Sequence, residues 1–338
     1  MNRSIHEPPR RVPTPGRLIL LGSLSLGALA ALLPAGCTRP PVGVAALIRG
    51  SDLRLLPATS VGLAVVEVKS LRDQEAAARW MEDFAKQLGT TPALARVQDL
   101  LGQDTIKKVD RLSLALVPLP GGQTGYAVLV EGAFDEAKVR ALTGGEAILT
   151  LLEVAGRPDM SLTVLPKSHL ALGPRAVLEG MRRNLDHPDA GLLKSPLVPL
   201  LEKVRATSQI WGAIDYAPLA ALARDAMAAR GSSVPFPSPT AASTLRAVAF
   251  EGRIDQTIDF NLFGEADAEK GARQLSDAAR GLVALARMGA SQKGTKEMLD
   301  FLDGVRIDQS GSEIHVHGTL SLAMARAIAG GLAARAGY

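Results

Sequence analysis

Three potential metal ligands alternate along one segment near the end of the chain. Glu313, His315 and His317 are separated by single apolar residues. In an extended strand every second side chain points to the same face, so this carboxylate and the two imidazoles could approach one ion, as such ligands do in zinc sites. The pattern therefore allows a metal-dependent enzyme. A half-exposed strand shows the same alternation without any metal, and we favour this plainer interpretation.

Two other segments resemble parts of known sites but lack the residues that would complete one. Asp186-His187-Pro188-Asp189 contains potential acid and base groups, yet its composition is typical of a turn. The segment 289–296 has the glycines and lysines of a phosphate-binding loop, but its lysine is misplaced and a helix is expected before it. The sequence contains no recognisable motif of a serine hydrolase or a zinc protease. We therefore assign no catalytic residue and expect no cofactor, although dispersed carboxylates would leave no local signature.

The only cysteine, Cys37, lies where an export signal would end. One cysteine cannot form a disulfide within the chain. An arginine-containing start is followed by the uncharged run 18–33, which is typical of the apolar part of a secretory signal and is short for a membrane-spanning helix. The residues Pro34-Ala35-Gly36-Cys37 that follow resemble the lipobox of bacterial lipoproteins, with proline where that family usually has leucine.

This resemblance implies cleavage between Gly36 and Cys37 and attachment of lipid to the cysteine thiol. The membrane would then be a partner of the protein through covalent lipid, and the body would lie in the cell envelope. Thr38, rather than aspartate, follows the cysteine. In lipoproteins of two-membrane bacteria this implies the outer membrane, facing the periplasm. The alternatives are an uncleaved anchor helix and an ordinary signal with an incidental cysteine, and both also place the body outside the cytoplasm.

The charge of the chain argues against nucleic acid as a partner. The formal net charge is +4, but four of the 38 basic residues and only one of the 34 acidic residues precede Cys37. The remaining body is therefore nearly neutral, and aromatic residues make up only 4% of the chain. Nucleic-acid binding depends on a basic surface and, for single strands, on aromatic stacking platforms.

The body has the element order of an α+β fold, with two similar halves of mainly antiparallel hairpins and packed helices. We divide the chain into a signal peptide (1–36), a lipid anchor and tether (37–57), a first α+β half (58–190) and a second α+β half (191–338). The tether is expected to lack regular structure because it contains prolines and glycine without sustained periodicity.

The second half repeats the pattern of the first. Residues 60–71 resemble residues 208–219, and each segment reads as a strand followed by the start of a helix. The hairpin predicted over 111–131 is echoed by another over 244–264. The body resembles a broad group of uncharacterised bacterial envelope proteins built from duplicated hairpin-helix units, a group that supplies no catalytic residues. Chance repetition of such units is the alternative explanation.

Together these observations favour a non-enzymatic binding or scaffolding module in the cell envelope. Its expected partner, besides the membrane, is another envelope protein or an apolar ligand. One alternative is a carrier that encloses lipid or another apolar molecule between the two halves. The other alternative is a metal-dependent hydrolase that uses His315 and His317 together with Glu313.

Overall fold

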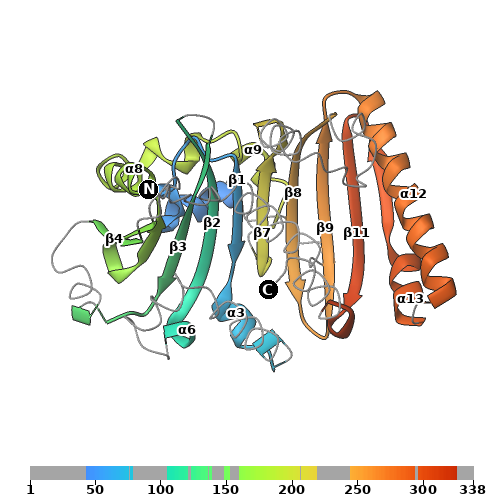
Figure 1. Cartoon of the computed structure of the whole chain (residues 1–338), viewed down its shortest axis with the longest axis horizontal. Coiled ribbons are helices and arrows are strands. Elements are labelled where there is room, and N and C mark those ends of the chain that lie inside the picture. Colours follow the sequence, from blue (N-terminus) through green and yellow to red (C-terminus); the bar gives the residue numbers. More distant parts are fainter. Residues whose placement is uncertain are drawn as a thin grey trace, which may run out of the picture.

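A computed structural model describes most of the body of the protein (Figure 1). The described residues are 43–75, 77–78, 105–120, 123–135, 137–138, 148–152, 160–205, 207–218, 244–293 and 296–325. The predicted signal peptide, its cleavage site and Cys37 lie outside these residues.

The described strands form one antiparallel sheet that runs through both halves of the body. Its strand order is β10 (Arg306–Ser310), β11 (Glu313–Ser321), β9 (Thr257–Ala266), β8 (Leu245–Ile254), β7 (Ile210–Asp215), β1 (Gly62–Val66), β2 (Val109–Leu119), β3 (Gln123–Gly132), β6 (Leu170–Gly173), β5 (Met160–Val164) and β4 (Ile148–Leu152). Helices pack on this sheet, so the predicted α+β class is confirmed. The predicted hairpins of both halves are present as β2–β3 and β8–β9.

The two halves meet at an antiparallel strand pair, β1 with β7, in the middle of the sheet. The sequence similarity between residues 60–71 and 208–219 makes Gly212 the counterpart of Ala64. These two residues are paired directly across the two strands. The seam is therefore approximately two-fold symmetric about this pair, with a long hairpin following on either side. Gly212 is required there, because a Cβ atom would lie only 2.1 Å from the backbone oxygen of Leu63.

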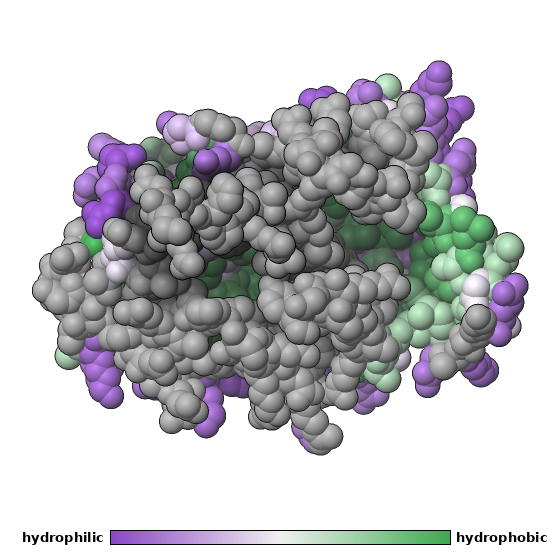
Figure 2. Space-filling model, viewed as in Figure 1, coloured by the Kyte–Doolittle hydropathy of each residue, from purple (hydrophilic) through white to green (hydrophobic). Residues whose placement is uncertain are grey.

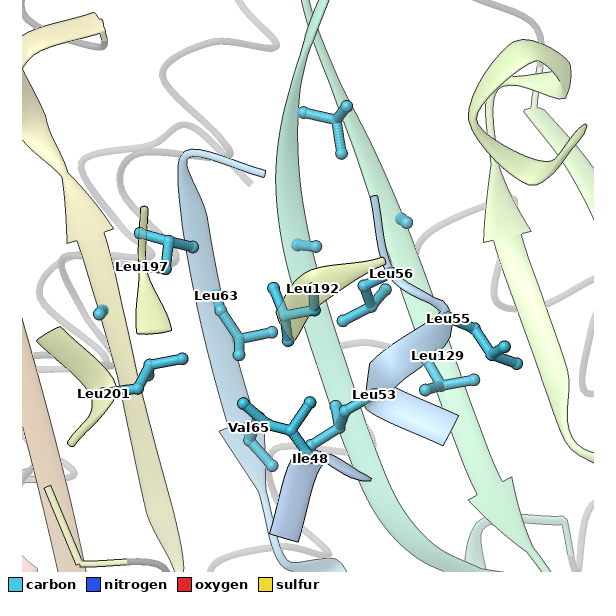
Figure 3. Close-up of a cluster of buried hydrophobic side chains, with 14 of the residues drawn as sticks. Ile48, Leu53, Leu55, Leu56, Leu63, Val65, Leu129, Leu192, Leu197 and Leu201 are labelled. Carbon is cyan, nitrogen blue, oxygen red and sulfur yellow. The ribbon is translucent and has the colours of Figure 1, made fainter. Parts of the chain in front are cut away.

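The central strands are apolar on both faces because helices or further chain segments cover both. On the face to which Leu63, Val65 and Leu129 point, hereafter the first face, the sheet packs against short helices from residues 44–55 and 175–201 (Figure 3). These are α2 (Val44–Gly50), η1 (Asp52–Leu55), α8 (Arg175–Asp186), η3 (Pro188–Ala190), η4 (Leu192–Lys194) and α9 (Val198–Leu201). The first face and these helices enclose the largest buried apolar cluster among the described residues.

The opposite face, hereafter the second face, carries a separate apolar cluster. Ala64, Phe250 and Leu320 lie in it, together with partly buried Met298 and Phe301 from α13 (Lys296–Gly304). Further helices are α3 (Val68–Arg72), α6 (Thr105–Lys108) and the long α12 (Glu269–Lys293), which contacts α13 and strand β10 near one edge of the sheet. The two clusters together bury the sheet on both sides.

The folded body begins earlier in the chain than the sequence suggests. Residues 37–57 are predicted as an unstructured tether, but Val44–Gly50 forms α2 and Asp52–Leu55 forms η1. Val44 and Ile48 are fully buried against the sheet. Periodicity misses this segment because each helix is too short to show an amphipathic repeat, and tertiary packing rather than intrinsic helix stability holds it in place.

Candidate functional site

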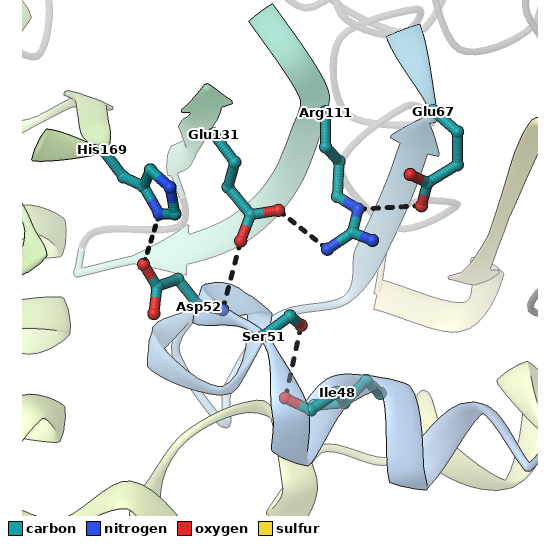
Figure 4. A network of polar contacts seen from close by, with 7 residues as sticks. All are labelled: Ile48, Ser51, Asp52, Glu67, Arg111, Glu131 and His169. Carbon is teal, nitrogen blue, oxygen red and sulfur yellow. Dashed lines mark hydrogen bonds and ion pairs between the residues drawn. The ribbon is translucent and has the colours of Figure 1, made fainter. Parts of the chain in front are cut away.

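A buried polar cluster joins the start of the folded body to the sheet (Figure 4). Asp52 at the start of η1, Glu131 at the end of β3 and His169 just before β6 come together from three different elements. The His169 Nδ1 atom lies 2.6 Å from a carboxylate oxygen of Asp52. The backbone N–H of Asp52 donates a hydrogen bond of 3.2 Å to Glu131. The cluster therefore fastens η1 to two strands at once.

Arg111 on β2 extends this cluster along the sheet. Its guanidinium donates hydrogen bonds of 2.8 Å to Glu131 and to Glu67, which follows β1. Burial alone would lower the pKa of Arg111, but the hydrogen bonds and charges of Glu67 and Glu131 raise it above its usual range. Arg111 is thus held in its charged form and compensates the buried carboxylates, the arrangement in which buried charges are tolerated.

The cluster has the donor set of a metal site, although its atoms already bond to one another. Ligand atoms of Asp52, Glu131 and His169 lie within 4.8 Å of one another. Oxygen and imidazole nitrogen ligands of this kind suit several divalent ions. Sequence reasoning missed the group because Asp52 is 79 residues from Glu131 and 117 from His169. Pairing of distant strands brings them together, and no local spacing indicates it.

A cavity of about 450 Å³ lies beside this cluster. It is lined mainly by charged and polar residues from the end of α2, from η1, from the turn η2 (Pro166–Ser168) and from η3 and η4: Arg49, Gly50, Ser51, Asp52, Arg54, Pro166, Lys167, Asp189 and Leu193. Asp52 thus belongs to both the buried cluster and the cavity wall. This cavity has the size of a small-ligand pocket, and its lining suits a polar or charged group.

The turn beside the cavity contains an unusual backbone conformation. Lys167 has φ of 60°, and it is the only described residue other than glycine with a positive φ. A side chain in this left-handed region is strained, and strain of this kind tends to be found at functional sites. The turn brings Lys167 to the cavity and leaves His169, two residues later, in contact with Asp52.

The predicted ligands Glu313, His315 and His317 all lie on β11 and alternate along it as expected. The rings of the two histidines are stacked, with centroids 5.8 Å apart. Glu313 is ion-paired with Lys203 at 2.5 Å, and His315 Nε2 lies 2.8 Å from the side-chain oxygen of Asn261 on β9. Each of these two residues therefore has a partner within the chain, and the metal site at these positions stays a prediction.

A second polar network lies beside His315 on the first face of the sheet. Glu251 on β8 is almost completely buried and accepts hydrogen bonds from Arg205, Ser208 and Asn261. Burial lowers the pKa of His315, and the neighbouring His317 lowers it further. The charges of Asp308 and Glu251 act in the opposite direction. Burial has the largest effect, so the neutral form of His315 is favoured despite these charges.

The remaining sequence features fall in different places. Gly36 and Cys37 lie outside the described residues, so lipid attachment stays a prediction. In the segment 186–189, Asp189 lines the cavity described above. Among the described residues, no helix is at once long enough and apolar enough to cross a membrane.

Helix α12 presents large apolar side chains to solvent. Leu282, Leu285 and Met288 are 48%, 63% and 60% exposed. Figure 2 shows hydrophobic surface gathered toward the side of the molecule where α12 and α13 lie. The three residues follow one another at intervals of three along a helix and so share one face. Grouped exposed apolar residues are typical of interaction surfaces.

Comparison with known proteins gave two distant structural similarities. No protein-family model and no curated protein matched the chain. The structure of TP0453 in crystal form III is similar to this chain with a TM-score of 0.45 and 10% sequence identity, over 80% of this chain and 94% of that one. Crystal form IV of TP0453 gives a TM-score of 0.42 and 10% identity, over 82% and 96% of the two chains.

Proposed function

We propose that this protein is a lipoprotein, anchored through lipid on Cys37, whose folded body serves as a non-enzymatic binding or scaffolding module at the membrane surface of the cell envelope. By the sorting rule that the lipobox resemblance implies, Thr38 favours the outer membrane, facing the periplasm. Besides the membrane, an envelope protein is the expected partner, and an apolar ligand belongs to the alternative function of a carrier.

The observation that carries this proposal is the short distance along the chain from the proposed anchor to the packed body. Val44 is fully buried and lies only seven residues after Cys37. An extended chain of that length spans at most about 25 Å. A lipid on Cys37 would therefore hold α2 and the neighbouring cavity close to the bilayer. Attachment by several acyl chains is durable, whereas one chain binds only reversibly.

The cavity supports binding of a polar group rather than of an apolar one. It has charged side chains from Arg49, Asp52 and Lys167 in its wall. Burying these charges against hydrocarbon would be unfavourable. The carrier of an apolar ligand is therefore not supported by this cavity, and it remains the weaker alternative. The hydrolase alternative is likewise weaker, because Glu313 and His315 already bond to Lys203 and Asn261.

Replacing the cysteine tests the anchor. In a bacterial host, the parent protein should incorporate labelled fatty acid and shift from precursor to mature size, whereas Cys37→Ser should do neither. A Thr38→Ser variant serves as the matched control, because it changes the adjacent residue and leaves the thiol in place. The proposal fails if Cys37→Ser protein is still processed and membrane-bound without incorporated fatty acid.

A further inference from the structure

The cavity beside η1 is lined by more positively charged than negatively charged side chains. Arg49, Arg54 and Lys167 line it, and none of them forms an ion pair with a described acidic side chain. Of the two carboxylates in the wall, Asp52 is already bonded to His169, which leaves Asp189. Three cations around one cavity create a local field that attracts an anion.

One of these cations is held in place at the expense of backbone strain. Lys167 keeps a left-handed conformation that glycine would adopt freely. The following residues continue directly into His169, which is fixed by its bond to Asp52. Strained positions persist only where the surrounding structure imposes them, and they concentrate at binding sites. The lysine at this turn is therefore independent support for a ligand in the cavity.

The position of the cavity indicates where its ligand comes from. Arg49 is twelve residues after Cys37, and α2 begins seven residues after it. With lipid on Cys37, this part of the protein would face the membrane surface. Phosphate esters are the anions of phospholipid headgroups, and arginine and lysine are the side chains that bind phosphate best.

We propose that this cavity binds a phosphate group, held by Arg49, Arg54 and Lys167, and that a phospholipid headgroup next to the anchor supplies it. The source of the phosphate, but not the binding site, rests on the proposed function. Asp189 in the same wall favours a headgroup that also carries an ammonium group, as phosphoethanolamine does. The body would then contact the membrane by a defined face rather than swing freely on its tether.

Vesicle binding tests the proposal on the full chain. All proteins carry Cys37→Ser, so that acylation makes no contribution to vesicle binding. The leader is present in every protein and contributes equally to the binding of each. The probe is vesicles of phosphatidylethanolamine and phosphatidylglycerol in equal parts, compared with vesicles of phosphate-free galactolipid. The pocket variant is Arg49→Gln/Arg54→Gln/Lys167→Gln. The control variant, Lys69→Gln/Arg246→Gln/Lys270→Gln, removes the same charge from exposed positions elsewhere.

We expect the pocket variant to bind the phospholipid vesicles about tenfold more weakly than the control variant. Neither variant should differ from the parent protein in its binding to galactolipid vesicles. A second arm measures thermal stabilisation by inorganic phosphate and by phosphoethanolamine. If vesicle binding is unchanged in the pocket variant but stabilisation by phosphate is lost, the site is supported and its source is free phosphate. Equal behaviour of the pocket and control variants in both arms overturns the proposal.

The single variant Lys167→Gly separates loss of binding from loss of folding. Glycine relieves the left-handed backbone and removes the charge, so this protein should be at least as stable as the parent and still bind phosphate more weakly. Unchanged phosphate binding in a folded Lys167→Gly protein would remove Lys167 from the site. Fatty-acid incorporation at Cys37 is measured separately. A negative result for phosphate binding in the cavity therefore does not contradict lipid attachment at Cys37, and a negative result for lipid attachment does not contradict phosphate binding.

Discussion

Ala64 and Gly212 are paired directly across the central strands β1 and β7, and each is the counterpart of the other in the two similar halves of the sequence. The pair lies at the approximate two-fold axis of the sheet. Backbone packs tightly around it, since a Cβ atom on Gly212 would lie 2.1 Å from the oxygen of Leu63 and 2.5 Å from the ring of Phe250.

We expect Gly212→Ala to destabilise the protein by about 3 kcal/mol, because the added methyl group forces backbone to move in a packed core. The matched control is Ala64→Gly, which should lower stability by only about 1 kcal/mol through backbone entropy. Denaturant unfolding measures both. Equal stability of the Gly212→Ala variant and the parent protein would show that the strands can separate at the seam without loss.

Removal of one partner from the buried network at Arg111 should be strongly destabilising. Glu131→Leu leaves Arg111 with Glu67 alone and removes the acceptor for the Asp52 N–H. We expect a loss of about 3 to 5 kcal/mol. Glu313→Leu is the control, since its ion pair with Lys203 is largely exposed and should contribute no more than about 1 kcal/mol. Similar losses for both variants would contradict a special role for the buried network.

His315 should make stability depend on pH below neutrality. Its pKa is lowered in the folded protein, so the unfolded chain binds a proton at a higher pH than the folded one. Its contribution to stability is therefore complete above the unfolded pKa of about 6.5 and is lost as pH falls toward the folded pKa. His315→Gln should flatten the pH dependence of the free energy of unfolding in that range. A pH profile identical to that of the parent protein would refute this assignment.

The strain at Lys167 predicts a stabilising substitution. Lys167→Gly should raise the free energy of unfolding by about 1 kcal/mol, because glycine adopts a positive φ without steric conflict. Lys167→Ala removes the same charge but keeps the conflict, so it should give no such gain. Thermal or denaturant unfolding distinguishes the two. A gain of equal size in both variants would assign the effect to charge instead of backbone conformation.

The exposed face of α12 should contribute little to the stability of the isolated protein. Leu285→Gln is expected to change the free energy of unfolding by no more than about 0.5 kcal/mol, because this side chain is 63% exposed. Leu63→Ala, in the core, should instead lower it by about 2 to 5 kcal/mol. A large loss for Leu285→Gln would mean that the side chain is packed in solution.

More of the fold than of the candidate sites could be predicted from the sequence. Alternating strands around Gly- or Asp-containing turns identify the hairpins β2–β3 and β8–β9, and the repeated pattern at residues 60 and 208 identifies the two strands of the seam. These signals are local in the chain. The α2 and η1 segment escaped prediction because burial of Val44 and Ile48 depends on contacts with distant strands.

The candidate sites were harder to predict than the fold, because contacts between distant segments assemble them. Glu313, His315 and His317 are visible in the sequence because they alternate in one strand, but their neighbours Lys203 and Asn261 are not. The group Asp52, Glu131 and His169 has no spacing that links its members, and strand pairing alone assembles it. A single sequence indicates which side chains share a strand face, and the packing of other elements decides what those side chains bind.

The symmetric seam has a consequence for the origin of the chain. A protein of half this length, ending its sheet at β1, would expose the backbone N–H and C=O groups of that strand, and such an open edge readily pairs with another copy. Two copies joined in antiparallel fashion through that edge form a C2 homodimer with the arrangement now seen between β1 and β7. Fusion of the two genes would then have turned an intersubunit interface into the interior of one polypeptide.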